Sequence, residues 1–413
     1  MRSWPQVYIP ILPSRFTVPP LSLFDTASQV IQEVPKQNVY RIYVCGITPY
    51  DATHLGHAAT YLTFDIAIRY LRATGSVVRY VQNATDIDDP LLERAERDQV
   101  DWQKLAQSQI DLSRGDMSDL HVIPPDHYVG VVEAMQEVIE AVKKLDEKKS
   151  TYLLDGDKYF RVHHDPAFGS RSHLAEAEAL QIFAERGGDP GKKGKEHPLD
   201  ALVWLTSKPE QPTWPSDFGA GRPGWHIECS AIALKYLEPD EDAEFSLDIQ
   251  GGGSDLIFPH HEMSAAQSEV MTGRKFSRHY IHTGMIGLDG EKMSKSRGNL
   301  VFVSKLIARG VHPMAIRWAL LNRSYREDSM WNDQQLSDAS RNIERLQLNL
   351  AKMEVAPTDS VIQTILNSLA SNLDTKGALT TLERWIDQTE AGEVGGNAGE
   401  LSRALDSLLG IAL

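Results

Sequence analysis

The pattern that most constrains the fold lies between residues 39 and 84. Residues 39–46 (VYRIYVCG) are β-branched and aromatic and end at a glycine, which predicts a strand. Residues 54–74 carry apolar side chains at helical spacing before Gly75, and residues 77–84 (VVRYVQNA) predict a second strand. A strand, a helix and a strand within about 45 residues form a βαβ unit, so we expect a doubly wound α/β fold with a parallel sheet.

Composition and patterning divide the rest of the chain into three parts. Residues 1–39 are rich in proline, which predicts an irregular N-terminal arm lying on a domain. We expect a Rossmann-type catalytic core over residues 40–310, with an inserted subdomain at about residues 115–200. The pattern then turns helical, and we expect a C-terminal helical domain over residues 311–413.

Local patterns inside the core support this division. Residues 91–150 are charged and helical in pattern, and residues 152–162 predict a hairpin with an Asp-Gly turn. Residues 166–200 are rich in loops, which is typical of an insertion between the two halves of a sheet. Core-like patterning returns at residues 201–207 and continues through residues 245–255.

Charge and cysteine content exclude several classes of protein. The 413 residues include 57 acids and 42 Lys and Arg, a net charge of −15, so a uniformly basic nucleic-acid binder is excluded, although a local basic patch is not. Cys45 and Cys229 are the only cysteines, which excludes a disulfide scaffold and predicts a reducing cytoplasm. No apolar run reaches about 18 residues, and prolines interrupt residues 1–16, so we expect neither a membrane span nor a signal peptide.

The first group of candidate site residues is His54-Leu55-Gly56-His57, between the first strand and the following helix. A helix N-terminus offers unpaired N–H groups and a positive dipole end to an anion. Gly56 permits close backbone approach, and two histidines three residues apart share one helical face. The four residues thus suit a phosphate site, with an ordinary surface turn as the alternative.

The second group is Lys292-Met293-Ser294-Lys295-Ser296, inside a glycine-flanked loop. Two lysines and two serines on such a loop suit a mobile clamp for triphosphate, and an exposed basic loop is the alternative. Together with the His-Leu-Gly-His segment, this loop resembles the paired motifs of class I aminoacyl-tRNA synthetases.

The third group contains both cysteines. Cys45 ends the first strand, Cys229 follows Gly-Trp-His-Ile-Glu, and His260 and His261 follow Phe-Pro. Two thiolates and an imidazole are suitable ligands for zinc, and two buried, inert cysteines are the alternative. The segments around these residues resemble cysteinyl-tRNA synthetase over roughly residues 40–330. The resemblance implies zinc ligands at Cys45, Cys229 and His260, and Ser264 stands where that family has a fourth ligand, glutamate.

Further departures point to a different branch of the superfamily. Pro49 and Ala59 replace residues usual in the synthetases, and residues 184–195 (AERGGDPGKKGK) differ from the synthetase segment. Residues 331–413 hold 12 acids and 6 bases, which does not favour binding of tRNA. In these respects the chain is similar to the cysteine:glucosaminyl-inositol ligases of mycothiol biosynthesis. The resemblance implies ATP, L-cysteine and glucosaminyl-inositol as substrates and no tRNA.

The resemblance also implies roles for individual residues. His54 and His57 would face charge at the α-phosphate of ATP, while Lys292 and Lys295 would hold the departing pyrophosphate, bridged by Mg²⁺. One zinc per chain would select cysteine over serine by binding its thiolate, a discrimination that an apolar pocket achieves only weakly. The contacts to ATP and cysteinyl-adenylate implied by the family are Cys45, Gly46, Ile47, Thr48, Thr60, Asn83, Ala84, Thr85, Trp225, Gly253, Ser254, Asp255 and Ile286.

Several alternatives remain open from the sequence. Thr85 and Asp255 suit the substrate ammonium, but Asp255 is equally typical of a helix cap, and Trp225 of core packing. Asp86, Asp88 and Asp89 follow the second strand and suit either acceptor binding or a helix start. The competing functions are a true cysteinyl-tRNA synthetase and a non-catalytic nucleotide-binding regulator. A monomer and a small homo-oligomer both remain open.

Overall fold

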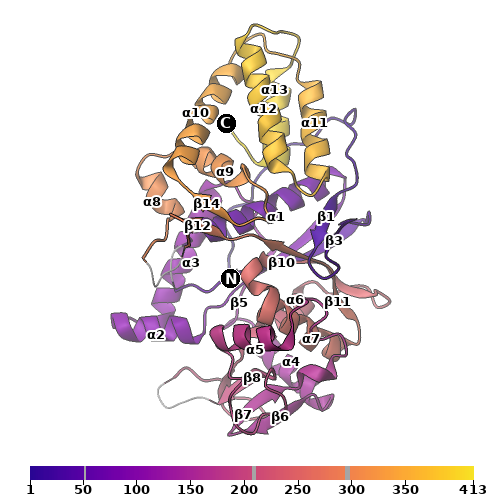
Figure 1. Cartoon of the computed structure of the whole chain (residues 1–413), viewed down its shortest axis with the longest axis vertical. Helices are drawn as coiled ribbons and strands as arrows, with labels where there is room; N and C mark the ends of the chain where they lie inside the picture. The colour runs from indigo at the N-terminus through magenta and orange to yellow at the C-terminus, as the bar shows by residue number, and fades with distance from the viewer. Residues whose placement is uncertain (51–52, 207–210, 294–297) are drawn as a thin grey trace.

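Five parallel strands form the centre of the computed structural model, which describes residues 1–50, 53–206, 211–293 and 298–413 (Figure 1). The strands are buried along most of their length, as expected for a parallel sheet covered on both faces. In spatial order they are β11 (Lys275–Thr283), β10 (Phe245–Gly253), β3 (Val39–Ile47), β4 (Val77–Ala84) and β5 (His127–Gly130). The predicted α/β class with a parallel sheet is confirmed.

The order of the strands locates a crevice. From β3 the chain proceeds outward to β4 and β5, and later returns to the other side of β3 as β10 and β11. The helix after β3, α1 (Leu55–Ala73), forms over the predicted residues. Connections therefore diverge between β3 and β10, and the carboxyl ends of these strands border the crevice where such sheets bind ligands.

The N-terminal arm differs from the expected irregular segment. β1 (Ser22–Asp25) and β2 (Val30–Glu33) form an antiparallel hairpin. Its turn is held by Asp25, whose carboxylate accepts hydrogen bonds from the backbone N–H groups of Ser28 and Tyr280. Both strands have only four residues, too few for alternation to show in the sequence.

The segment predicted as helical over residues 91–150 contains a strand. It forms α2 (Asp89–Asp98), α3 (Trp102–Asp119), strand β5 and α4 (Met135–Glu147). The expectation of continuous helix is therefore wrong at β5. Its four residues, His-Tyr-Val-Gly, become a strand because β4 offers a free edge, which no local pattern reveals.

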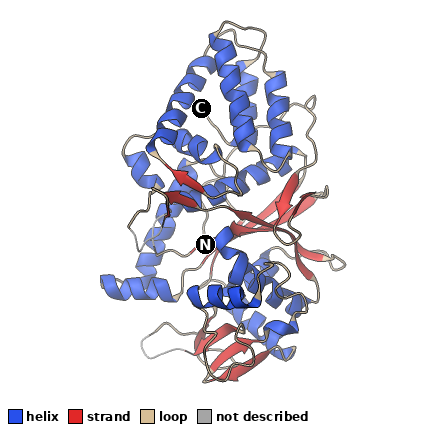
Figure 2. Ribbon diagram, in the orientation of Figure 1, coloured by secondary structure: helices blue, strands red, loops and turns tan. Residues whose placement is uncertain are grey.

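A second, antiparallel sheet lies at the far end of the molecule from the C-terminal helices (Figure 2). The predicted hairpin within residues 152–162 is confirmed as β6 and β7. Residues 201–206, expected in the core, join this sheet instead, so it extends beyond the predicted insertion of about 115–200. The strands are β6 (Thr151–Leu154), β7 (Asp157–Phe160), β8 (Ala201–Thr206) and β9 (Gly221–Pro223). Helix α4 and three further helices share one buried cluster with it: α5 (Glu176–Glu185), α6 (Trp225–Tyr236) and α7 (Glu262–Thr272).

The C-terminal region is helical as predicted, apart from one strand. A small sheet joins β12 (Ile286–Leu288), β13 (Glu291–Lys292) and β14 (Ser329–Trp331). The helices are α8 (Val303–Ala308), α9 (Pro313–Leu321), α10 (Asp333–Leu350), α11 (Asp359–Ala370), α12 (Thr375–Glu390) and α13 (Ala398–Leu409). None of the helices described combines the length and apolar composition needed to cross a membrane.

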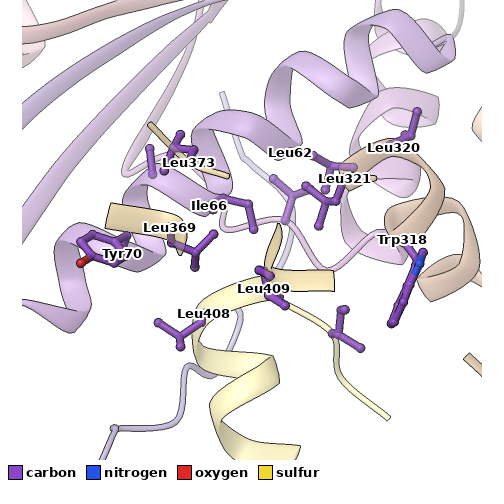
Figure 3. Packing of buried hydrophobic residues seen from close by; sticks show 14 of the residues in the cluster. Leu62, Ile66, Tyr70, Trp318, Leu320, Leu321, Leu369, Leu373, Leu408 and Leu409 are labelled. Atoms are coloured by element: carbon purple, nitrogen blue, oxygen red, sulfur yellow. The ribbon is translucent and has the colours of Figure 1, made fainter. Parts of the chain in front are cut away.

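Packing joins this helical region to the central sheet through α1. Leucine, isoleucine and aromatic side chains from α1, α9, α11 and α13 meet in one buried cluster (Figure 3). Arg317 is also fully buried there, paired with Asp65 of α1, and its guanidinium donates to the carbonyls of Leu409 at 2.6 Å and Leu120 at 2.8 Å. A buried cation satisfied by three separate elements holds the helices in one position on the sheet.

Candidate functional site

The crevice at the carboxyl ends of the strands contains a cavity of about 400 Å³. It is bordered by the ends of β3 and β10, the start of α1 and the start of α6. Nine of the residues predicted to contact adenylate or ATP line it: Cys45, Gly46, Thr48, His54, His57, Thr60, Trp225, Gly253 and Asp255. The structure therefore brings together segments that are more than 200 residues apart.

The floor of the cavity is set by Gly46. Its N–H donates to the side-chain oxygen of Asn83 at 2.8 Å, and a Cβ at this position would lie 1.6 Å from the carbonyl oxygen of Asn83. Only glycine fits at that distance, because real Cβ contacts are far longer. Close approach of β3 to β4 leaves room above them for a ligand.

The two histidines of the first motif share one wall. His54 is the N-cap of α1, and its Nδ1 accepts a hydrogen bond from the N–H of Gly56 at 3.0 Å. The centroids of the His54 and His57 rings are 4.0 Å apart. Burial lowers the pKa of His57 to about 4, so the ring is neutral at pH 7, and its buried Nδ1 has no hydrogen-bond partner among the residues described. Such an orphaned ring nitrogen at a helix N-terminus suits a ligand oxygen.

The other predicted contact residues lie around the cavity without lining it. Asn83 supports Gly46 and also donates to Thr85 at 3.1 Å. Lys292 contributes its main chain to β13, while Lys295, Ser294 and Ser296 lie outside the described residues. The predicted residues that are described but absent from the lining are Ile47, Asn83, Ala84, Thr85, Ser254 and Ile286.

A second feature, here called the thiol cluster, consists of Cys45, Cys229 and His260. Their potential ligand atoms all lie within 4.8 Å of one another and are buried. The two Sγ atoms are 4.0 Å apart, and Nε2 of His260 is 3.3 Å from Sγ of Cys229. Tetrahedral zinc with bonds of about 2.3 Å to sulfur and 2.0–2.1 Å to nitrogen would separate the ligand atoms by roughly 3.5–3.8 Å. The cluster therefore fits zinc.

The surroundings of the thiol cluster agree with that fit. Cys45 donates to Cys229, and this hydrogen bond, with His260 adding to it, lowers the pKa of the Cys229 thiol, while burial raises that of Cys45. The other ring nitrogen of His260 lies 3.0 Å from Nδ1 of His226, and Trp225 stacks on the His260 ring at 4.4 Å. A metal-binding histidine is usually oriented in this way by a partner on its second nitrogen.

Ser264 does not join the cluster. Its hydroxyl lies 2.7 Å from the carbonyl oxygen of His260, one helical turn earlier, and 3.3 Å from that of His226. With its side chain bonded to the backbone, the position occupied by glutamate in the synthetases supplies no carboxylate. Among the described residues near Ser264, the groups that could hold a metal are therefore Cys45, Cys229 and His260.

Sequence reasoning missed a hydrogen-bonded chain behind Cys45. His261 Nε2 is 3.2 Å from Cys45 Sγ, His261 Nδ1 is 2.7 Å from His282 Nε2, and His282 Nδ1 is 2.8 Å from Thr26 Oγ1. All four side chains are buried. The adjacency of two histidines was the one available signal, since Thr26 and His282 are brought in only by the fold.

The cavity also has lining residues that the sequence did not indicate. They are mostly apolar or glycine, and Leu300 follows the lysine loop closely, which is the signal that could have found it. The additional residues are Tyr50, Tyr61, Leu256, Gly284, Met285 and Leu300, and Met293 of the lysine loop also lines the cavity.

Comparison with known proteins shows which family and which solved structures this fold resembles. Residues 31–341 match the family described as tRNA synthetases class I (C) catalytic domain. Among solved structures, the fold is similar to methionyl-tRNA synthetase of Mycobacterium tuberculosis in complex with methionyl-adenylate, with TM-score 0.64 and 17% identity, covering 90% of this chain and 88% of that one. A leucyl-tRNA synthetase of Agrobacterium radiobacter in a ternary complex aligns with TM-score 0.63 and 12% identity, over 91% and 83% of the two chains.

Much closer similarity is found to proteins named L-cysteine:1D-myo-inositol 2-amino-2-deoxy-alpha-D-glucopyranoside ligase. The protein of Rhodococcus jostii is 52% identical over 424 residues, covering 100% of this chain and 99% of that protein. Those of Nocardia farcinica and Acidothermus cellulolyticus are 50% and 48% identical, each over the full length of both chains. With such identity along its entire length, and a parallel sheet of the synthetase type, this chain belongs to the family of L-cysteine:1D-myo-inositol 2-amino-2-deoxy-alpha-D-glucopyranoside ligases.

Proposed function

We propose that this chain activates L-cysteine with ATP as cysteinyl-adenylate and transfers it to the 2-amino group of glucosaminyl-inositol. The products would be an amide, AMP and pyrophosphate. One observation carries the proposal: Cys45 belongs both to the adenylate cavity and to the thiol cluster. A thiol-selecting group thus stands beside the cavity in which the carboxylate of the same amino acid would be activated.

The first half-reaction needs stabilisation of charge at the phosphates. The carboxylate of cysteine attacks the α-phosphate, and pyrophosphate leaves. His54 and His57 line the cavity at the N-terminus of α1, where imidazole N–H groups and the helix dipole favour an anion. We assign Lys292 and Lys295 to the departing pyrophosphate, with Mg²⁺, on the resemblance alone.

Selection of cysteine would depend on zinc held by Cys45, Cys229 and His260. When bound there, the metal supplies a soft Lewis acid that prefers a thiolate to the hydroxyl of serine. The chain's own contribution is orientation: Trp225 and His226 hold the His260 ring, and Ser264 leaves one position open. Trp225 also lines the adenylate cavity, so the same side chain aligns both sites.

We propose that tRNA is not a substrate. Residues 331–413 include 12 acids and 6 bases, and two of those bases are already paired: Arg341 with Asp338, and Arg345 with Asp387 and Glu390. Binding of a nucleic acid requires several free cations facing phosphates. Two unpaired cysteines with sulfur atoms 4.0 Å apart favour a reducing compartment, the cytoplasm.

The test uses purified enzyme carrying preformed cysteinyl-adenylate. Glucosaminyl-inositol and total tRNA from the same source would be added separately, and amide, charged tRNA and AMP measured. We expect amide with the amino sugar and no charged tRNA. Charged tRNA without amide would overturn the proposal in favour of a synthetase, and failure of cysteine-dependent ATP–pyrophosphate exchange would favour a non-catalytic protein.

A further inference from the structure

A larger cavity, here called the outer cavity, opens beside the adenylate cavity. Its volume is about 710 Å³, within the range of roughly 300–1,000 Å³ typical of small-molecule sites. It lies between the second sheet, the start of α2 and the start of α6. Thr48, Tyr50 and Trp225 line both cavities, so a ligand in the outer cavity reaches the adenylate site directly.

The walls of the outer cavity are acidic. Six carboxylates line it against three lysine or arginine side chains. The three cations are already engaged: Arg222 pairs with Asp89, Lys192 pairs with Asp157 at 3.1 Å, and Arg186 donates to two backbone carbonyls. Asp189 pairs with Lys195, so Asp88, Glu93 and Glu228 are the carboxyl groups of the lining that have no ion-pair partner among the described residues.

Two of these carboxyl groups lie near the junction with the adenylate cavity. Glu228 is 1% exposed, and its Oε2 has no hydrogen-bond partner among the residues described. Asp88 is half-buried, accepts a hydrogen bond from Leu91 N–H at 3.0 Å and is bonded to Thr48. Within the described part of the chain, neither carboxylate forms an ion pair. A buried carboxylate oxygen without a partner is costly unless a ligand supplies one.

The opposite wall offers hydroxyl-binding groups. The hydroxyl of Tyr159 donates to Asp189 at 2.5 Å, and Lys192 donates to the Tyr159 oxygen at 3.0 Å. Asp189 belongs to the segment after α5 in which the sequence departs from the synthetases. Arg186, from the same segment, donates to the carbonyl of Asp255, which anchors the segment to the adenylate cavity.

We propose that the outer cavity binds the acceptor, a polyhydroxylated amine, with Asp88 and Glu228 holding its amino group beside the adenylate. The inference rests on the proposed function and adds the place and recognition of its second substrate. An ammonium group supplies the missing partner of Glu228, and the polar wall around Tyr159 faces the ring hydroxyls. Thr48, bonded to Asp88 and lining both cavities, places the carboxylate at the point of transfer.

The transfer step follows from this placement. The acceptor enters as an ammonium ion, and one proton passes from nitrogen to the Asp88 carboxylate. The nitrogen lone pair attacks the carbonyl carbon of cysteinyl-adenylate, forming the C–N bond. The C–O bond to phosphate breaks, its electron pair leaves with AMP, and the second nitrogen proton passes to solvent.

Burial raises the pKa of Asp88 to about 7, which suits a group that accepts a proton near neutral pH. The groups that face it come from α2, β9, α6 and the loop after β3. Asp89 on the same helix adds negative charge, Arg222 from β9 opposes the shift, Thr48 donates a hydrogen bond, and Glu228 lies on α6. If Asp88 accepts the proton, its substitution removes the rise of the transfer rate near pH 7. A purely structural role of Asp88 would not produce that change.

The test compares Asp88→Asn with Asp101→Asn. Each aspartate is the N-cap of a helix, α2 or α3, and asparagine retains capping, so the same change is made inside and outside the outer cavity. Transfer from preformed cysteinyl-adenylate to glucosaminyl-inositol is measured in a single turnover, and ATP–pyrophosphate exchange reports an intact adenylate site. Because general-base groups contribute about 10²–10⁴-fold, we expect Asp88→Asn to slow transfer at least about 100-fold and to abolish its rise near pH 7.

A second variant, Leu205→Trp, fills the outer cavity from β8 and should raise the KM for the acceptor without impairing exchange. The inference is overturned if the wild type forms amide while Asp88→Asn transfers as fast as Asp101→Asn, or if Leu205→Trp leaves the acceptor KM unchanged. Absence of amide from the wild-type adenylate would instead overturn the proposed function, on which this inference depends.

Discussion

The Nε2 atom of His261 lies 3.2 Å from the Sγ atom of Cys45. Since a metal-bound thiolate only accepts hydrogen bonds, His261 would carry its proton on Nε2 and accept on Nδ1 from His282, 2.7 Å away. The next bond then runs from the hydroxyl of Thr26 to Nδ1 of His282. Because every hydrogen bond in this series is donated toward Cys45, the series fixes the tautomers of His261 and His282 and orients Cys45, a proposed zinc ligand.

These hydrogen bonds predict that substitution of a residue that does not itself bind the metal weakens zinc binding. His282→Gln should weaken zinc binding by up to about 10-fold, the low end of the roughly 10–100-fold range for loss of a direct hydrogen bond to a ligand, because His282 acts on Cys45 through His261. His279→Gln is the matched control, because His279 is also buried on β11 but its bonded partner is Gln32. Competition with a chelator measures both, and equal affinities of the two variants would contradict the assigned role.

The second prediction concerns the rate of adenylate formation after substitution of Gly46. Gly46→Ala puts a Cβ 1.6 Å from the carbonyl oxygen of Asn83, so β3 and β4 must separate and the cavity floor must move. Because a displacement of 1 Å can cost about 10²-fold in rate, we expect exchange to fall by at least that factor. Gly115→Ala, an exposed site on α3 with open space, should instead stabilise the protein by about 1 kcal/mol. Wild-type exchange in Gly46→Ala would remove the argument.

Sequence periodicity predicted the elements that are long and whose neighbours are close in the chain. β3, α1 and β4 follow from apolar spacing over residues 39–84 because each buries a face against the next. β5 and β1 have four residues each and become strands only because β4 and β2 pair with them. Their formation depends on tertiary context, which a local pattern does not contain.

The site residues likewise divide into those with a local sequence signal and those brought together only by the fold. Cys45, Cys229 and His260 were predicted together because only two cysteines exist and each stands in a distinctive segment. His282 was missed because a single histidine in a buried strand has no distinguishing pattern. The outer cavity was missed for a different reason, since residues 201–223 were expected in the core rather than in the sheet that forms its wall.

Arg317 predicts a large loss of stability away from the site. It is fully buried with Asp65, which also pairs with Arg69, so its loss removes one of two cations from a buried carboxylate and leaves the carbonyls of Leu409 and Leu120 without this donor. Arg317→Met should therefore lower the free energy of unfolding by about 3–5 kcal/mol. Arg341→Met, which breaks an exposed pair with Asp338, should cost less than about 1 kcal/mol. Urea unfolding measures both, and similar losses in the two variants would contradict the role given to Arg317.

Lys295, outside the described residues, is tested by kinetics. If it meets charge that develops as pyrophosphate leaves, Lys295→Ala should lower kcat for adenylate formation by about 10²–10³-fold and change the KM for cysteine little. Lys275→Ala is the control, since Lys275 is exposed at the start of β11, at the opposite end of the strand from the crevice, and pairs with Glu244. An unchanged exchange rate in Lys295→Ala would separate the lysine loop from the mechanism.

His57 predicts how stability depends on pH. Burial lowers its pKa to about 4 in the folded protein, whereas the unfolded chain has the ordinary value of about 6.5. Between these values the unfolded state binds a proton that the folded state does not, so the contribution is complete above about pH 6.5 and is lost as the pH falls toward 4. Part of the ring faces the crevice, so between about pH 7.5 and pH 5 we expect a loss of about 1–2 kcal/mol from this residue.

The measurement compares wild type and His57→Asn by urea unfolding at the two pH values. Other titrating groups, including the thiol cluster, contribute equally to both proteins, so the difference between their pH dependences isolates His57. The wild type should lose more stability on acidification than the variant. A bound adenylate analogue should reduce that difference, because the phosphate of the ligand favours the imidazolium form and raises the pKa of His57. Equal pH dependence in both proteins would mean that the ring is not held in its neutral form.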